Sequence, residues 1–165
     1  AREAVGAINP QVLVTPVQQR ADARLLDTLV PTADVVLDCT DNFATRQAIN
    51  RACVAHGKPL VAGAAIRFDG QVSVYDTRGA NAPCYACVFP PQDQVEEAQC
   101  ATMGVFAPLV GIIGTMQAAE ALRLLMGVGS SLAGRLQMLD ARTMEWSEMR
   151  IRRDPTCPVC AMRAG

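Results

Sequence analysis

Two pairs of cysteines have the spacing of a metal site. Cys84 and Cys87 form the first CxxC pair, and Cys157 and Cys160 form the second. A two-residue spacing lets both thiolates of a pair reach one ion, and two pairs complete the tetrahedral set that Zn²⁺ prefers. The sequence therefore predicts a closed, structural four-cysteine zinc site, in which no coordination position is left for a substrate.

Two other uses of paired cysteines are less favoured. Disulfides are typical of secreted proteins, and the sequence shows no signal-peptide pattern. A redox CxxC motif normally occurs once, where a helix opens after a strand. Because the sequence shows no signal-peptide pattern, we also expect the protein to be cytoplasmic.

The other three cysteines differ in their surroundings. Cys39 lies in an expected buried strand and Cys53 in an expected helix, so both are interpreted as core residues. Cys100 lies in a long stretch without periodicity, just before an apolar helix. A thiol near a helix N-terminus can have a lowered pKa and act as a nucleophile. An incidental loop thiol is the equally weighted alternative for Cys100.

Carboxylates follow the central apolar strand. Asp38 and Asp41 stand at the end of the run DVVLDCT, with Asn42 next along the chain. Ligands of parallel α/β sheets bind beyond the carboxyl ends of the strands, where an aspartate can hold Mg²⁺ beside a phosphate. The alternative is that Asp41 or Asn42 only caps the following helix, and the residues by themselves favour this cap.

The first part of the chain has the pattern of a βαβ unit. Apolar β-branched runs alternate with segments of helical periodicity. We expect helices over residues 1–8, 21–30 and 43–56, and strands over 11–17, 34–40 and 59–64. The fold class is therefore α/β, with a partial, Rossmann-like parallel sheet.

The second part of the chain changes pattern. Residues 68–76 alternate, which predicts a half-exposed antiparallel strand, and residues 89–102 read as a long loop. Residues 104–126 predict a buried helix, and residues 135–142 and 145–153 predict two strands joined as a hairpin at Thr143 and Met144. The 165 residues are enough for a single domain, 1–165, with antiparallel strands after the parallel ones.

Composition excludes several function classes. Half of the residues are hydrophobic, 19% are charged, and the net charge is −1. This is a globular composition without a basic surface for nucleic acid or anionic lipid. The uncharged stretch from Val105 to Ala119 is shorter than the ~20 residues of a membrane span, so we expect no membrane association.

Together these segments resemble the MoeB/ThiF/HesA family, relatives of ubiquitin-activating enzymes. The resemblance runs in order through most of the chain, and AAIRFDGQ looks closer to the molybdopterin-pathway branch. It is carried by INPQVLVTPV, DVVLDCTDNFATRQAIN, PLVAGAAIRFDGQVSVYD, PCYAC, CATMGVFAPLVGIIGTMQAAEALRLL, GRLQMLDART and CPVC.

The resemblance implies a reaction, cofactors and partners. Members of the family use ATP and Mg²⁺ to adenylate the C-terminal glycine of a small ubiquitin-like sulfur-carrier protein, and they are homodimers. It implies that Asp41 binds magnesium, with Asn42 beside it, which overturns the capping interpretation. It also implies that the four paired cysteines hold zinc and that Cys100 corresponds to a cysteine that some members link to the carrier.

The sequence also departs from the family. The glycine-rich nucleotide loop, the ribose aspartate and the phosphate-binding arginine and lysine of the family all precede the matched region. Lys58, the single lysine, follows the wrong helix to replace that lysine. We therefore expect the C-terminal part of an adenylating domain without its N-terminal nucleotide-loop half, inactive by itself.

This departure leaves a second interpretation of the function, and one more residue is a candidate for binding the partner. The chain could be a zinc-stabilised binding module that docks a ubiquitin-like partner without catalysis. Arg67, which follows a strand, is a possible contact for the carrier, although a solvent-facing arginine is the more common case.

Overall fold

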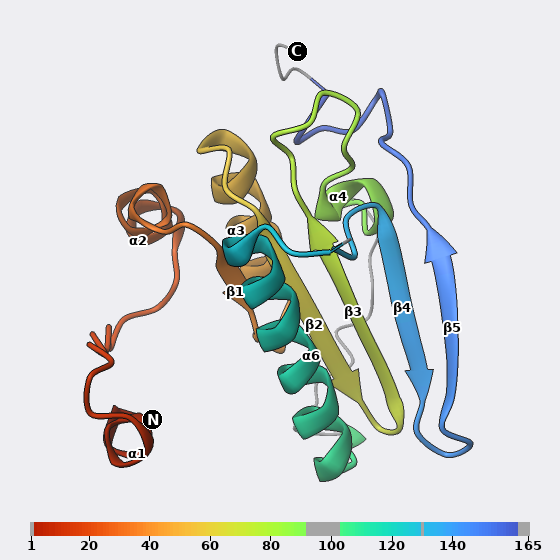
Figure 1. Cartoon of the computed structure of the whole chain (residues 1–165). Coiled ribbons are helices and arrows are strands. Elements are labelled where there is room, and N and C mark those ends of the chain that lie inside the picture. Colours follow the sequence, from red (N-terminus) through yellow and green to blue (C-terminus); the bar gives the residue numbers. More distant parts are fainter. Residues whose placement is uncertain (1, 92–102, 130, 162–165) are drawn as a thin grey trace.

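The structure is a computed structural model that describes residues 2–91, 103–129 and 131–161. One five-stranded sheet in the order β1-β2-β3-β4-β5 forms its centre (Figure 1). β1 and β2 are parallel, and the later neighbours are antiparallel. The prediction of a parallel sheet that continues into antiparallel strands is confirmed. The strands are β1 (Val36–Asp38), β2 (Leu60–Ile66), β3 (Asp69–Tyr75), β4 (Arg135–Asp140) and β5 (Glu145–Arg150).

Helix α3 (Phe43–Ala55) makes the crossover from β1 to β2, as predicted. Its N-terminus is capped by Asn42, whose Oδ1 accepts a hydrogen bond from the Thr45 N–H at 2.9 Å. Its C-terminus is followed by Gly57 at φ +60°, a left-handed conformation that glycine adopts without steric cost. The cap and the glycine therefore fix where the crossover helix begins and ends.

Helices cover both faces of the sheet (Figure 1). Helix α6 (Ala107–Met126) packs on the face of Val61, Val72 and Val74. The other face is covered by α2 (Ala23–Leu29), the 3₁₀ turn η1 (Val30–Thr32) and α3. The prediction that residues 68–76 are half-exposed is therefore wrong, because β3 lies in the middle of the sheet with a layer on each side.

A buried helix was predicted for residues 104–126, and helix α6 is buried on one face only. Leu109, Ile113 and Ala121 are buried against the sheet, whereas Leu122 and Leu125 are each 54% exposed. The helix is long and apolar enough to cross a membrane by length and composition alone. Its packing on β2 and β3 accounts for the apolar residues of the sheet-facing side.

Residues 11–17 do not form the predicted strand. They have no regular structure, and helix α1 (Arg2–Ile8) before them is exposed along its whole length, away from the sheet (Figure 1). A strand needs a neighbour to pair its backbone N–H and C=O groups, and the described residues provide none for this segment. The alternation of QVLVTPV therefore does not produce a strand in the part of the chain that the structure describes.

The β4–β5 hairpin forms as predicted. Asp140 pairs with Glu145, and Met144 in the turn has φ +59°. β5 is the outer strand, and all six of its residues are exposed.

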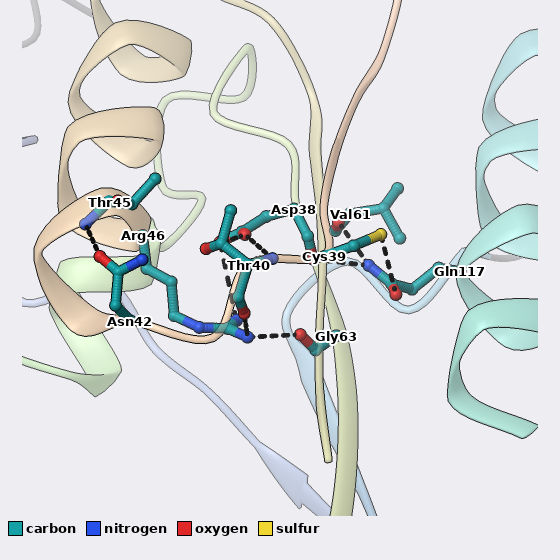
Figure 2. Close-up of polar contacts among 9 residues, drawn as sticks. All are labelled: Asp38, Cys39, Thr40, Asn42, Thr45, Arg46, Val61, Gly63 and Gln117. Atoms are coloured by element: carbon teal, nitrogen blue, oxygen red, sulfur yellow. Dashed lines mark hydrogen bonds and ion pairs between the residues drawn. The ribbon is translucent and has the colours of Figure 1, made fainter. Parts of the chain in front are cut away.

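Gln117 of α6 ties the helix to the two parallel strands (Figure 2). Its Nε2 donates to the Asp38 carbonyl at 2.8 Å and to the Val61 carbonyl at 3.2 Å. A Cβ atom on Gly63 would overlap the Gln117 side chain. Glycine at position 63 is therefore required by the close approach of this buried amide.

We expect Gly63→Ala to lower the free energy of unfolding by about 1–3 kcal/mol, the usual cost of adding a methyl group to a filled core. The added methyl must displace Gln117 and break its bonds to two carbonyls. Gly111→Ala is the matched control, since its Cβ meets nothing within 4 Å and alanine favours a helix by up to about 1 kcal/mol. Urea denaturation of both variants measures the difference, and equal stabilities would contradict the role given to Gln117.

Candidate functional site

The four paired cysteines converge on one point. Their sulfur atoms all lie within 4.8 Å of one another. Three of the sulfur–sulfur distances are 3.9 Å for Cys84–Cys87, 3.7 Å for Cys84–Cys157 and 3.5 Å for Cys87–Cys160. A tetrahedral ion with bonds of about 2.3 Å places its ligands about 3.8 Å apart, whereas a disulfide is about 2.05 Å long. The cysteines are positioned to bind a metal and do not form disulfides.

Two distant parts of the chain build this metal centre. Cys84 is the N-cap of helix α4 (Tyr85–Val88) and Cys87 lies within that helix, whereas Cys157 and Cys160 lie in the segment after β5. Three of the four are fully buried, Cys87 being the partly exposed one. Such a centre has no open face for a substrate, and convergence of both pairs is unlike a single redox CxxC.

Arg153 joins the segment of the second cysteine pair, Cys157 and Cys160, to the loop that precedes the first pair. Its guanidinium donates to the carbonyls of Cys160 at 2.7 Å and Ala161 at 3.1 Å, and to the Ala80 carbonyl at 2.9 Å. In addition, the Asp154 N–H donates to the Cys87 sulfur at 3.4 Å. Hydrogen bonds from the Cys84 thiol and from this N–H lower the pKa of Cys87 to about 5, so Cys87 is readily a thiolate, the form that binds metals.

A second group of polar residues lies where β1 ends. Asp38 is 1% exposed, and its Oδ1 accepts from the Thr40 N–H at 2.9 Å and the Thr40 hydroxyl at 2.7 Å (Figure 2). These bonds bend the chain into the turn of residues 38–42. Asp38 Oδ2 has no hydrogen bond, but it is buried and Asp38 does not line the cavity described below, so Asp41 is the aspartate that a ligand can reach.

Arg46, in the first turns of α3, holds this turn in place. Its Nη1 lies 3.6 Å from Asp38 Oδ2, and its Nη2 donates to the Gly63 carbonyl at 2.8 Å and to the Thr40 carbonyl (Figure 2). The guanidinium thus joins β1, α3 and β2 at one point. Sequence reasoning missed both Arg46 and Gln117; an amide within the uncharged stretch of a helix was the available signal for Gln117.

Asp41 faces a cavity of about 530 Å³ beyond the carboxyl end of β1. Its side chain has no hydrogen-bond or ion-pair partner among the described residues, whereas Asn42 is used as the helix cap. The capping interpretation is therefore confirmed for Asn42 and wrong for Asp41. Small residues (Gly63, Ala64, Gly114), aromatic residues and aliphatic residues line most of the remaining wall.

The single cysteines divide between core and cavity. Cys53 is 2% exposed, and burial raises its pKa to about 12, so the prediction of a core residue is confirmed. Cys39 was also expected in the core, but it is exposed and lines the cavity, because β1 ends before it. Partial burial and the Asp38 carboxylate raise the pKa of Cys39, which keeps it a neutral thiol. Cys100 lies outside the described residues.

Arg67 lies in the turn between β2 and β3, at φ +49°. Its backbone N–H donates to the Gly104 carbonyl at 3.0 Å, and its carbonyl accepts from the Phe106 N–H at 2.7 Å. The residue is exposed and is not among those that line the cavity with Asp41. Its contact with a carrier stays a prediction.

Comparison with solved structures shows the same fold. Escherichia coli MccB in its ATP complex superposes with a TM-score of 0.77 at 17% sequence identity, over 96% of this chain and 48% of that chain. At this identity the likeness concerns the fold alone.

Curated relatives are much closer in sequence. The chain is 43% identical over 160 residues to the molybdopterin-synthase adenylyltransferase of E. coli K12, covering 97% of the chain and 64% of the relative. It is 45% identical over 153 residues to the sulfur carrier protein ThiS adenylyltransferase of the same strain, covering 93% of the chain and 60% of the relative. The chain thus spans less than two thirds of the length of either relative. Since residues 1–159 also match the ThiF family, and since the fold and the paired cysteines agree with that match, the chain belongs to the ThiF family.

Proposed function

We propose that the complete protein adenylates the C-terminal glycine of a ubiquitin-like sulfur carrier, with ATP as the donor. The observation that carries this proposal is the carboxylate of Asp41, which has no partner in the described part of the chain and lies beside a cavity at the carboxyl end of β1. The names of the two E. coli relatives support it. Because the 165 residues contain no glycine-rich phosphate loop, we expect them to be inactive by themselves.

The reaction sets the requirements for the site. A carrier carboxylate oxygen attacks the α-phosphorus of ATP, a new O–P bond forms, and the bond to the bridging oxygen breaks to release pyrophosphate. Asp41 would hold Mg²⁺, which when bound neutralises charge on the phosphates. Arg46 keeps the Asp41 turn in place through the Thr40 carbonyl, so the carboxylate is oriented before substrates arrive.

The cavity beside Asp41 is proposed to receive the end of the carrier protein. Its wall includes Ala64 and Gly114, whose small size leaves room for an extended segment that ends in glycine. The two relatives have almost equal identities to this chain, so either the molybdopterin or the thiamine pathway could supply the carrier.

The remaining partners belong to the same proposal. Arg67, exposed at the β2–β3 turn, would contact the carrier. The exposed face of α6, with Leu122 and Leu125, would join two copies in a cytoplasmic homodimer, since large exposed apolar faces mark interfaces.

Asp41→Asn tests the adenylation in the protein expressed from its complete reading frame. The substitution preserves size and removes the charge that attracts magnesium, so we expect carrier-dependent exchange of pyrophosphate into ATP to fall by at least ~100-fold, as for other lost electrostatic groups. Asp34→Asn, at an exposed aspartate before β1, is the control and should leave exchange unchanged. Near-wild-type exchange in Asp41→Asn would remove Asp41 from the mechanism.

We propose zinc as the ion of the four-cysteine centre, because four thiolates in a tetrahedral array suit zinc, with iron the main competitor. Metal analysis should give one zinc and no iron per chain, and Cys157→Ser should reduce the zinc content and lower the melting temperature. Cys39→Ser is the control, since Cys39 lies outside the cluster. Iron in place of zinc, or full zinc occupancy in Cys157→Ser, would contradict this assignment.

A further inference from the structure

Asn50 is a buried polar residue on helix α3 that the adenylation proposal does not use. It is 1% exposed and lies against the metal centre rather than the cavity. Its Nδ2 donates to the Cys84 sulfur at 3.6 Å, and its Oδ1 accepts from the Tyr85 N–H at 2.9 Å. Both the NH₂ group and the oxygen of the amide therefore form hydrogen bonds to the segment of the first cysteine pair, Cys84 to Cys87.

The chemistry of the two partners fixes the orientation of this amide. A metal-bound thiolate can only accept a hydrogen bond, and a backbone N–H can only donate one. Reversing the Asn50 amide would place its oxygen against the sulfur and its NH₂ group against an N–H. Asn50 thus holds Cys84 in one position and also satisfies the first N–H of helix α4, whose cap Cys84 makes no side-chain hydrogen bond to it.

Asn50 also lies one helical turn after Arg46. Residues four apart share one face of a helix, so the two side chains point from neighbouring turns of α3. Arg46 bonds to the Thr40 and Gly63 carbonyls, and Asn50 bonds to the metal knuckle. The same rigid segment of α3 therefore contacts the Asp41 turn at one end and the metal centre at the other.

We propose that Asn50 is a positioning residue of the metal centre, which stabilises the Cys84 thiolate by an N–H···S hydrogen bond and joins the metal to helix α3. The inference rests on the assignment of a metal to the four cysteines and not on the adenylation reaction. It gives the metal a specific structural task, which is to hold the helix that follows the Asp41 turn.

Asn50→Asp is the sharpest variant for this proposal. It is isosteric and keeps the acceptor for the Tyr85 N–H, but it loses the donor to sulfur and places a negative charge beside the thiolate. Substitution of groups that hydrogen-bond to metal ligands typically costs 10–100-fold in affinity, so we expect zinc transfer to a chromogenic chelator at roughly 10–100 times lower chelator concentration. Arg51→Gln, on the exposed side of the same helix, is the control and should behave like the wild type. Zinc retention in Asn50→Asp equal to wild type would overturn the proposal.

A second measurement uses the wild type, in case Asn50→Asp does not fold. Stripping zinc with a chelator should increase hydrogen exchange of the α3 amides after Arg46, while the amides of α6, on the opposite face of the sheet, keep their protection. Unchanged exchange in α3, or an equal increase in α3 and α6, would show that the metal does not act through Asn50. A protein purified without metal would overturn the metal centre itself, which the stoichiometry measurement reports separately.

Discussion

The buried contact between Asp38 and Arg46 is the constraint on which the cavity depends. Asp38 ends β1, Arg46 lies in α3, and the same guanidinium reaches a carbonyl of β2. Removing one member of such a buried pair leaves an uncompensated charge and typically costs about 3–5 kcal/mol. The turn that carries Asp41 lies outside any helix or strand, but the Arg46 guanidinium ties it to β1 and β2.

Helix α3 connects the cavity beside Asp41 with the four-cysteine metal centre. Asn42 starts it, Arg46 anchors it to the strand ends, and Asn50 anchors it to the cysteine knuckle. Its apolar side, with Ile49 and Cys53, packs on the sheet. A helix held by polar contacts at its start and middle and by apolar contacts along its length has little freedom to shift, which suits a site whose geometry must be set before substrates bind.

Much of this arrangement could be predicted from the sequence where the signal is local. The cap and the C-terminal glycine of α3, the β4–β5 hairpin and the CxxC spacing all depend on neighbouring residues. The predictions that were wrong depend on contacts with residues distant in the sequence. Residues 11–17 have no neighbour for pairing among residues 2–91, 103–129 and 131–161, β3 is covered on both faces by distant helices, and Cys39 follows a strand shorter than expected. The partners of Gln117 likewise become visible only once the strands are side by side.

The close packing of Gly63 against Gln117 has a consequence for how this chain can vary during evolution. A larger residue at position 63 needs a shorter one at position 117, but a shorter side chain there no longer reaches the Asp38 and Val61 carbonyls. Each single replacement is therefore harmful, and a double replacement loses two hydrogen bonds to carbonyls of β1 and β2. The effect of a substitution at either position thus depends on the residue at the other. We expect both the glycine and the glutamine to be retained while other positions of the sheet change.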